Sequence, residues 1–311
     1  MGIHRNIILV GCILSAVLFI ALRVDGAEHQ ESLPKILYDQ YKEVKPRLEN
    51  SPFGVPLFIK TDFPPSKIHC AVYGLMDHPF AMIRKMLLNP GNWCDILSLH
   101  TNIKACTWEK IEHHQDILTL YVGRKYYQKP EDALKLALEF HGADSPEEYF
   151  QVRLSADKGP FFTRHYRVEL DAVPLPSGKT FIRLSYEYDF GEALETALKI
   201  YYATLGRKKV GFTVVGTDKK GNPVYVKGNQ GLIERNAVRS YISIQSFMET
   251  LKYPEHTRFE KRIHRWYALV NEFPKQLYDL SENEYIRNKV QENADQVRLQ
   301  KNLRLFLNNK N

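Results

Sequence analysis

The sequence predicts an α+β fold in which an antiparallel sheet with one covered face is followed by a long helix, with added helices at both ends. Two observations carry this prediction. Three long segments between residues 148 and 190 alternate apolar and polar residues, which is typical of antiparallel strands with one covered face. The segment from Leu232 to Leu251 has an apolar stripe at helical spacing.

The first 27 residues have the layout of a signal peptide. His4 and Arg5 form a short basic region, residues 7–22 are uncharged and mostly apolar, and small residues precede Glu28. The apolar run is short for a membrane-spanning helix. We therefore expect an exported protein, periplasmic or secreted, that is cleaved near Ala27. An uncleaved N-terminus that anchors the protein in the membrane is the main alternative, and a lipid-modified Cys12 is another.

Residues 28–65 are predicted to form an N-terminal helix and a linker. Residues 33–48 place apolar side chains at helical spacing, and Pro46 is expected to interrupt this helix. Residues 51–65 are rich in proline and are interpreted as a link. The main domain is expected to span residues 66–251.

The main domain is predicted to begin with a strand over residues 68–76, followed by two short helices. Asp77 and Pro79 are suited to start a helix over residues 80–88, because aspartate can cap free N–H groups and proline is tolerated in the first turn. Residues 89–91, Asn-Pro-Gly, should break this helix, and residues 93–99 should form the second one.

Strands dominate the next part of the sequence. Residues 117–122 are interpreted as a buried strand and residues 130–141 as a helical insertion. The alternating segments follow at 150–155, 162–170 and 182–190, and residues 174–178 form the turn between the last two. Residues 192–205 predict a helix, and residues 210–227 predict a shorter hairpin.

Residues 252–311 are predicted to form a helical extension. An apolar stripe marks a helix over residues 259–278. Residues 281–311 are polar and charged with few apolar positions, so we expect a loosely attached helix with a frayed end.

The cysteines predict one disulfide. Cys70, Cys94 and Cys106 remain after the predicted cleavage, and in an oxidising compartment an odd number allows at most one internal bridge. We expect it between Cys94 and Cys106, with Cys70 buried and inert in its strand; three reduced, buried thiols are the alternative. No metal is predicted, because His113 and His114 would point to opposite sides of a strand.

The order of strand, helix pair, long antiparallel strands and long helix resembles the helix-grip fold of the START-like lipid-binding and polyketide-cyclase-like superfamily. The resemblance is one of layout over about residues 66–251. It is carried by residues 68–76, 77–80 and 89–93, by the three strands between 148 and 190, and by the helix from Leu232. The predicted helix at 192–205 and hairpin at 210–227 depart from the simplest plan of that superfamily. The resemblance implies a curved antiparallel sheet around a long C-terminal helix, with a hydrophobic cavity between them for a lipid or another apolar ligand. The protein could bind, carry or transform this ligand.

The candidate ligand-binding residues are mostly aromatic. They are Tyr166, Tyr186 and Tyr188 on the apolar faces of adjacent strands, Leu184 beside them, and Tyr73, Trp93 and Tyr241 from elements expected to enclose the same space. Tyrosine places a hydroxyl group in an apolar wall, which suits an amphiphile, although core packing explains the pattern equally well. Arg235 is the candidate contact for a ligand headgroup, with a structural ion pair as the alternative.

No catalytic residue and no cofactor are predicted. His78 and His165 could each act as a general base, but neither has a serine, cysteine or aspartate at a recognisable nucleophile spacing. Residues 206–211 lack the order of a phosphate-binding loop, and residues 228–231 are interpreted as a turn and helix cap.

Charge and export together limit the classes of partner. The net charge is +7, but a secreted chain rarely meets nucleic acid, so an anionic membrane surface is the candidate peripheral partner. Ordinary solubility charge is the alternative explanation. The sequence carries no signal for an oligomeric state.

We expect an exported binding or carrier protein for a lipid or other apolar ligand. An exported cyclase- or hydrolase-like enzyme on the same fold is one alternative, which would be favoured if Asp77, His78 or Arg235 faced the cavity. A noncatalytic envelope-interaction protein with a filled core is the other.

Overall fold

The computed structural model of the chain describes residues 32–62, 64, 66–111, 115–160, 163–192, 196 and 208–308. The predicted signal peptide, His113 and His114, and most of the predicted helix over residues 192–205 lie outside these residues. Within the described ranges, no helix combines the length and the apolar character needed to cross a membrane.

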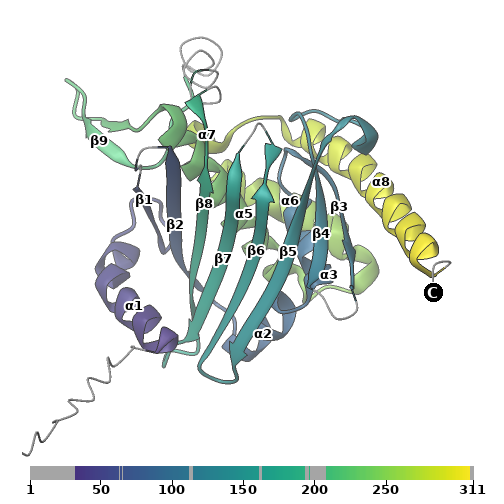
Figure 1. Cartoon of the computed structure of the whole chain (residues 1–311). Helices are drawn as coiled ribbons and strands as arrows, with labels where there is room; N and C mark the ends of the chain where they lie inside the picture. The colour runs from purple at the N-terminus through teal and green to yellow at the C-terminus, as the bar shows by residue number, and fades with distance from the viewer. Residues whose placement is uncertain are drawn as a thin grey trace, which may run out of the picture. The chain divides into compact units, whose positions relative to one another are not determined.

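In the described part of the chain, eight strands form one antiparallel sheet in the order β1-β2-β8-β7-β6-β5-β4-β3 (Figure 1). Their bounds are β1 Leu57–Asp62, β2 Lys67–Met76, β3 Ile103–Glu109, β4 Asp116–Val122, β5 Leu134–Ser145, β6 Tyr149–Lys158, β7 Arg164–Pro174 and β8 Thr180–Asp189. All of β2 pairs with β8, from Lys67 opposite Asp189 to Met76 opposite Thr180. Two strands far apart in the sequence therefore pair in one layer, next to the edge strand β1.

The helices cover both faces and one edge of this sheet. They are α1 Leu33–Glu49, α2 Phe80–Leu87, α3 Pro90–Leu97, η1 Pro130–Asp132, α5 Gly228–Thr250, α6 Glu255–Asn271, α7 Pro274–Leu277 and α8 Glu282–Asn308. The long helix α5 contacts β1, β2 and β8 on one side and α3, α6 and α7 on others. Because α5 is enclosed by the sheet and these helices, the predicted helix-grip class is confirmed.

Two hydrophobic cores follow from the period of two in the strands. On β2, Val72 points into the main core between the sheet and α5, whereas its neighbour Tyr73 points to the opposite face. There α1 packs a smaller core through Leu37, Val44 and Leu48. The predicted amphipathic helix is present, but Pro46 does not interrupt it, because the proline lies in the last turn and the helix continues to Glu49.

The predicted helix over residues 130–141 is wrong. Only residues 130–132 are helical, and residues 134–145 form β5, which pairs with β4 and β6. Leucine, alanine, lysine and glutamate favour a helix in isolation, but Leu136, Leu138 and Phe140 alternate with exposed residues. Hydrogen bonding to β4 on one side and to β6 on the other therefore makes this segment a strand.

Other boundaries also differ from the predictions. The expected link over residues 51–65 contains β1, and β3 was not predicted as a strand. Asp77 does not cap α2, which follows Pro79 without a side-chain cap, and residues 228–231 belong to the first turn of α5. Asn89 is not part of a simple break: its side chain caps α3 by accepting a hydrogen bond from the Gly91 N–H at 2.9 Å. Pro274 begins a separate short helix, so the helix predicted over residues 259–278 is divided into α6 and α7.

The expectation of a loosely attached C-terminal helix is wrong as well. Helix α8 lies along β3 at the edge of the sheet (Figure 1). The Cys106 N–H donates to Gln296 Oε1 at 2.8 Å and the Trp108 N–H donates to Gln300 Oε1 at 2.9 Å. The two glutamine side chains thus accept hydrogen bonds from backbone N–H groups that would otherwise be unpaired on an edge strand. Because the attachment uses polar groups, an apolar stripe does not reveal it.

The hairpin predicted within residues 210–227 is confirmed as β9 Val214–Thr217 and β10 Pro223–Tyr225, which form a small separate sheet. Its base is fastened to the first turns of α5, because Glu234 accepts hydrogen bonds from the backbone N–H groups of Phe212 at 2.6 Å and Thr213 at 3.0 Å.

Candidate ligand cavity

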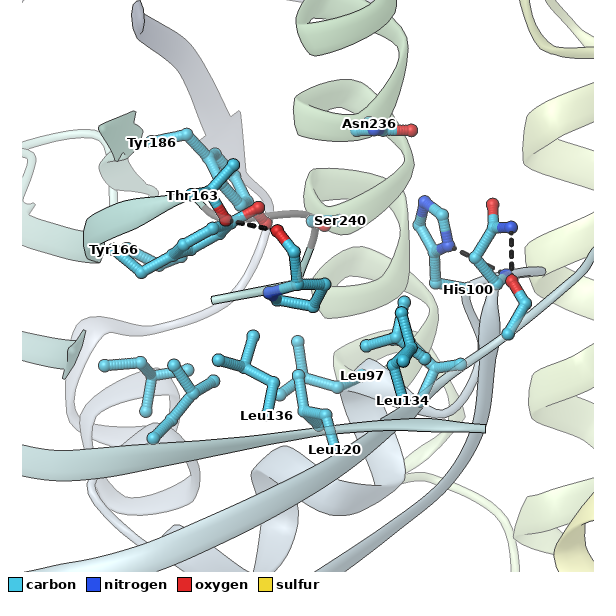
Figure 2. A pocket seen from close by; sticks show the side chains of 18 of the residues that line it. Leu97, His100, Leu120, Leu134, Leu136, Thr163, Tyr166, Tyr186, Asn236 and Ser240 are labelled. Atoms are coloured by element: carbon cyan, nitrogen blue, oxygen red, sulfur yellow. Dashed lines mark hydrogen bonds between the residues drawn. The ribbon is translucent and has the colours of Figure 1, made fainter. Parts of the chain in front are cut away.

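A cavity of about 700 Å³ lies between the inner face of the sheet and α5 (Figure 2). One wall is apolar and comes from successive strands. Its leucines and valine are Leu120 on β4, Leu136 and Leu138 on β5, Leu154 on β6 and Val168 on β7. These residues face the same side because side chains of a strand alternate between its two faces.

Tyrosines form one end of the cavity. Tyr166 and Tyr188, on neighbouring strands, stack with ring centroids 4.9 Å apart. Burial raises the pKa of Tyr166 to about 12, and burial also raises the pKa of Tyr186, whose hydroxyl is hydrogen-bonded to Ser240 of α5. The phenols are therefore neutral at physiological pH.

His100 lines the cavity on the side opposite the tyrosines (Figure 2). Its Nδ1 accepts a hydrogen bond from the Asn102 N–H at 3.1 Å, so Nε2 carries the proton of the neutral ring. Desolvation, followed by the positive charges of Arg239 and Lys289, lowers the pKa of His100 to about 3. His100 is therefore an uncharged hydrogen-bonding group, and nothing in the sequence around it signals this position.

Helix α5 contributes a polar stripe, defined here as Asn236, Ser240 and Ser243, which follows Leu232 along the cavity. Spacings of three and four residues place these side chains on one face of the helix. Asn236 Oδ1 accepts from Arg239 Nη1 at 3.4 Å, and Ser243 Oγ accepts from Trp266 Nε1 at 2.9 Å. The stripe is therefore held by residues outside the cavity.

Charged residues line the mouth of the cavity. Arg124 and Asp132 are exposed, and Gln128 joins their segments by accepting from the Arg124 N–H at 3.0 Å and donating to the Asp132 carbonyl at 2.6 Å. The next residue, Lys125, pairs with buried Asp279, which also pairs with Arg239. Burial raises the pKa of Asp279, but the nearby cations outweigh this effect and hold the pKa below its usual value. This ion cluster ties the mouth loop to α5.

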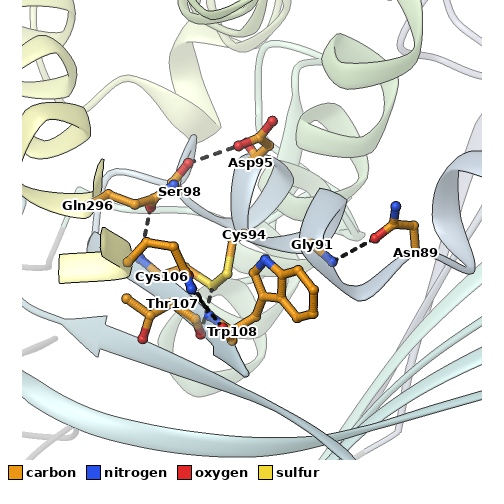
Figure 3. The surroundings of a disulfide bond; sticks show 10 residues. Asn89, Gly91, Cys94, Asp95, Ser98, Cys106, Thr107, Trp108 and Gln296 are labelled. Atoms are coloured by element: carbon orange, nitrogen blue, oxygen red, sulfur yellow. Dashed lines mark hydrogen bonds between the residues drawn. A yellow bond between two sulfur atoms is a disulfide. The ribbon is translucent and has the colours of Figure 1, made fainter. Parts of the chain in front are cut away.

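A disulfide joins the segments on either side of His100 in the sequence, and Figure 3 shows this bridge. The bridge joins Cys94 of α3 to Cys106 of β3, and Cys70 is free and buried, as predicted. His100 lies between the two bridged cysteines in the sequence. Lys289 of α8 also donates to the His100 carbonyl at 2.8 Å. The disulfide and α8 together position this side of the cavity.

The structure brings together three of the predicted ligand-binding residues, Tyr166, Tyr186 and Tyr188. Leu184 does not line the cavity; it is buried in the solid core between Val72 and Leu170 on the neighbouring strands. The expectation that one space includes all the selected residues is therefore wrong.

The four other predicted residues lie elsewhere. Tyr73 packs on the opposite face of the sheet, because it is one residue out of phase with the core-facing positions of β2. Trp93 is buried in the main core, where its Nε1 donates to the Leu87 carbonyl at 2.7 Å. Tyr241 lines a separate pocket of about 220 Å³, and Arg235 donates to the Val210 carbonyl at 3.1 Å.

The residues considered for catalysis do not face the cavity. Asp77 and His78 line the separate pocket beside Tyr241. His165 is exposed on the other side of the sheet, where its Nδ1 lies 2.7 Å from Asp189 Oδ2. In the described part of the chain, no group of three or more histidine, cysteine or acidic side chains could hold a metal ion.

Comparison with solved structures finds helix-grip proteins at low similarity. A STAR-related lipid transfer protein from Xanthomonas axonopodis is 8% identical, with 47% of this chain and 85% of that chain covered and a TM-score of 0.33. Human StAR-related lipid transfer protein 5 is 8% identical, with 70% and 99% covered and a TM-score of 0.34. Norcoclaurine synthase from Thalictrum flavum is 15% identical, with 45% and 79% covered and a TM-score of 0.31.

No family model and no curated protein matches the chain. The solved structures include both lipid transfer proteins and an enzyme, and their scores are low. The assignment of the fold therefore rests on the strand order and the enclosed helix α5, and the function has to be argued from the cavity.

Proposed function

We propose that the protein binds and carries a lipid or another apolar ligand in the cavity between the sheet and α5. The observation that carries this proposal is the cavity itself, about 700 Å³ with a wall of leucines and hydrogen-bonding groups opposite them. Ligand pockets of proteins typically measure about 300–1,000 Å³ and combine an apolar lining with a few polar groups. Protein cores are otherwise packed with few voids larger than a water molecule.

The same observations favour a carrier over the two alternatives. An envelope-interaction protein with a filled core needs no space of this size. A cyclase- or hydrolase-like enzyme would be supported by Asp77, His78 or Arg235 at the cavity, but these residues lie in the separate pocket or bond to the Val210 carbonyl.

The direct test is native mass spectrometry of the protein purified from its own compartment, combined with extraction and identification of bound lipid. Titration of the delipidated protein with N-phenylnaphthylamine, an uncharged fluorescent probe of apolar sites, gives a second measurement. We expect a mass adduct that organic extraction removes, and saturable binding of about one probe per chain. Absence of both would contradict the carrier function.

Export is a further part of the proposal. The signal-peptide layout of the first 27 residues supports it, and a disulfide between Cys94 and Cys106 is in keeping with an oxidising compartment. N-terminal sequencing of the mature protein should begin near Glu28. An intact Met1 or a lipid-modified Cys12 would contradict cleavage at this site.

We place the proposed peripheral contact with anionic membranes on the hairpin β9–β10. Val214 and Val215 are 50% and 60% exposed, and Lys219 and Lys220 lie in the turn of the same hairpin with one acidic residue, Asp218. Lys227 follows the hairpin, directly before α5. Exposed apolar groups among lysines suit the headgroup region of an anionic bilayer. Flotation with phosphatidylglycerol vesicles should recover the protein, and V215D should weaken recovery; equal recovery with phosphatidylcholine vesicles would refute the contact.

A further inference from the structure

The hydrogen-bonding groups inside the cavity are uncharged. They come from His100, from the polar stripe of α5 and from Tyr186. Among the described residues that line the cavity, the charged side chains are those of Arg124 and Asp132, and both are exposed at the mouth. Among the described lining residues, the charged groups therefore lie only at the entrance.

The buried charged side chains Glu234 and Arg239 of α5 already bond to partners outside the cavity. Arg239 Nη2 donates to Asp279 Oδ2 at 2.7 Å and to the Leu277 carbonyl at 3.1 Å. Glu234 accepts from the hairpin backbone and from Thr213 Oγ1 at 2.7 Å. These side chains are held in place by their bonds, so they do not supply a counter-charge to a ligand.

A charged group brought among the leucines would lose its hydration without gaining an opposite charge. Burial of an unpaired ion is costly in a protein interior, whereas a hydroxyl or carbonyl group is compensated by one or two hydrogen bonds. The polar stripe offers such bonds through the Asn236 amide and the Ser240 hydroxyl, which can each donate or accept. The Ser243 hydroxyl is already engaged, because it donates to the Arg239 carbonyl at 2.9 Å and accepts from Trp266 Nε1.

We propose that the ligand is an uncharged amphiphile whose hydroxyl or carbonyl oxygen binds the polar stripe of α5 while its hydrocarbon part packs on the leucine wall. This inference rests on the proposed function and specifies its ligand class. Asn236 is the central contact, since it lines the cavity one helical turn before Ser240 and its side chain is hydrogen-bonded to His100, so it links the two polar groups.

The test compares ligands that share one hydrocarbon chain. Dodecanol, dodecanoate and dodecylammonium each compete with bound N-phenylnaphthylamine at about pH 8, where the acid and the amine are both ionised. We expect dodecanol to displace the probe at a concentration at least about tenfold lower than either ion. Equal potency of dodecanoate or dodecylammonium would overturn the inference.

Substitutions on α5 test which residues give the preference for an uncharged ligand. N236L keeps a similar shape but removes the amide, so the potency of dodecanol relative to dodecanoate should fall by about three- to tenfold. S240A should lower the same ratio to a smaller extent. Q245L, on the same helix but outside the cavity, is the matched control and should leave the ratio unchanged. An unchanged ratio in both N236L and S240A would overturn the role of the stripe.

Failure of the proposed function gives a different result from failure of this inference. If the cavity binds no apolar ligand, N-phenylnaphthylamine does not saturate and none of the dodecyl compounds binds. If the cavity binds ligands without preference for uncharged ones, the probe saturates and the three compounds compete equally.

Discussion

Filling the cavity with a larger side chain should abolish ligand binding at little cost in stability. Leu136 lies in the cavity wall, so the indole of L136W can extend into a space of about 700 Å³. The matched control is L184W, because Leu184 is 1% exposed and is packed in the solid core of the same sheet. The two variants make the same chemical change at a hollow position and at a filled one.

The expected magnitudes follow from these surroundings. Overpacking a filled core costs about 1–3 kcal/mol, and in a domain of this size each kcal/mol lowers Tm by roughly 2–4 °C. L184W should therefore lose roughly 2–12 °C in Tm. L136W should lose less than about 1 kcal/mol, because the ring meets empty space instead of neighbouring atoms.

The assay combines thermal melts with titration of N-phenylnaphthylamine. L136W should weaken probe binding by at least about tenfold, whereas L184W should change it by less than about threefold. If L136W destabilises the protein as much as L184W does and leaves probe binding intact, the reasoning from the cavity is refuted.

The remaining predictions concern stability. E292Q removes the carboxylate between two buried lysines and should cost about 3 kcal/mol in urea unfolding, whereas E131Q at an exposed, solvent-screened ion pair should leave the unfolding midpoint nearly unchanged; equal losses would contradict the buried cluster. Because the pKa of His100 falls from 6.5 to about 3 on folding, stability should decline as pH falls through this window, and H100Q should flatten the decline in Tm. Non-reducing peptide maps should show Cys94 linked to Cys106, and C94S with C106S should lower the free energy of unfolding by about 2–3 kcal/mol; free alkylation of both thiols would refute the bridge.

Elements with a clear local pattern could be predicted from the sequence. The strands β6, β7 and β8 show a period of two because most positions on their outer face are polar, although α1 buries part of that face, and α5 shows the helical period. The disulfide could be predicted from cysteine number and spacing. Local patterning was ambiguous for β5, whose composition favours a helix, so strand pairing with β4 and β6 decided its conformation.

The candidate site depended more on tertiary structure than the fold did. Tyr166, Tyr186 and Tyr188 could be found because alternation assigns them to one face. His100 and Asn236 could not, since each is a single polar residue whose position facing the cavity follows from how α3, β3 and α5 pack. Tyr73 and Leu184 show the opposite error, because both were predicted to line the cavity and neither does. Tyr73 lies on the far face of the sheet, and Leu184 lies in the filled core.

By itself, the sequence determined the elements that show a clear local period, such as β6, β7, β8 and α5, and which side of each is apolar, because these properties depend on neighbours within a few residues. Only the tertiary structure decided that α8 attaches to β3 through Gln296 and Gln300, and that a cavity remains beneath α5. Both features depend on the distance between elements that are remote in the chain. That distance is set by the packing of the whole domain, which no local pattern encodes.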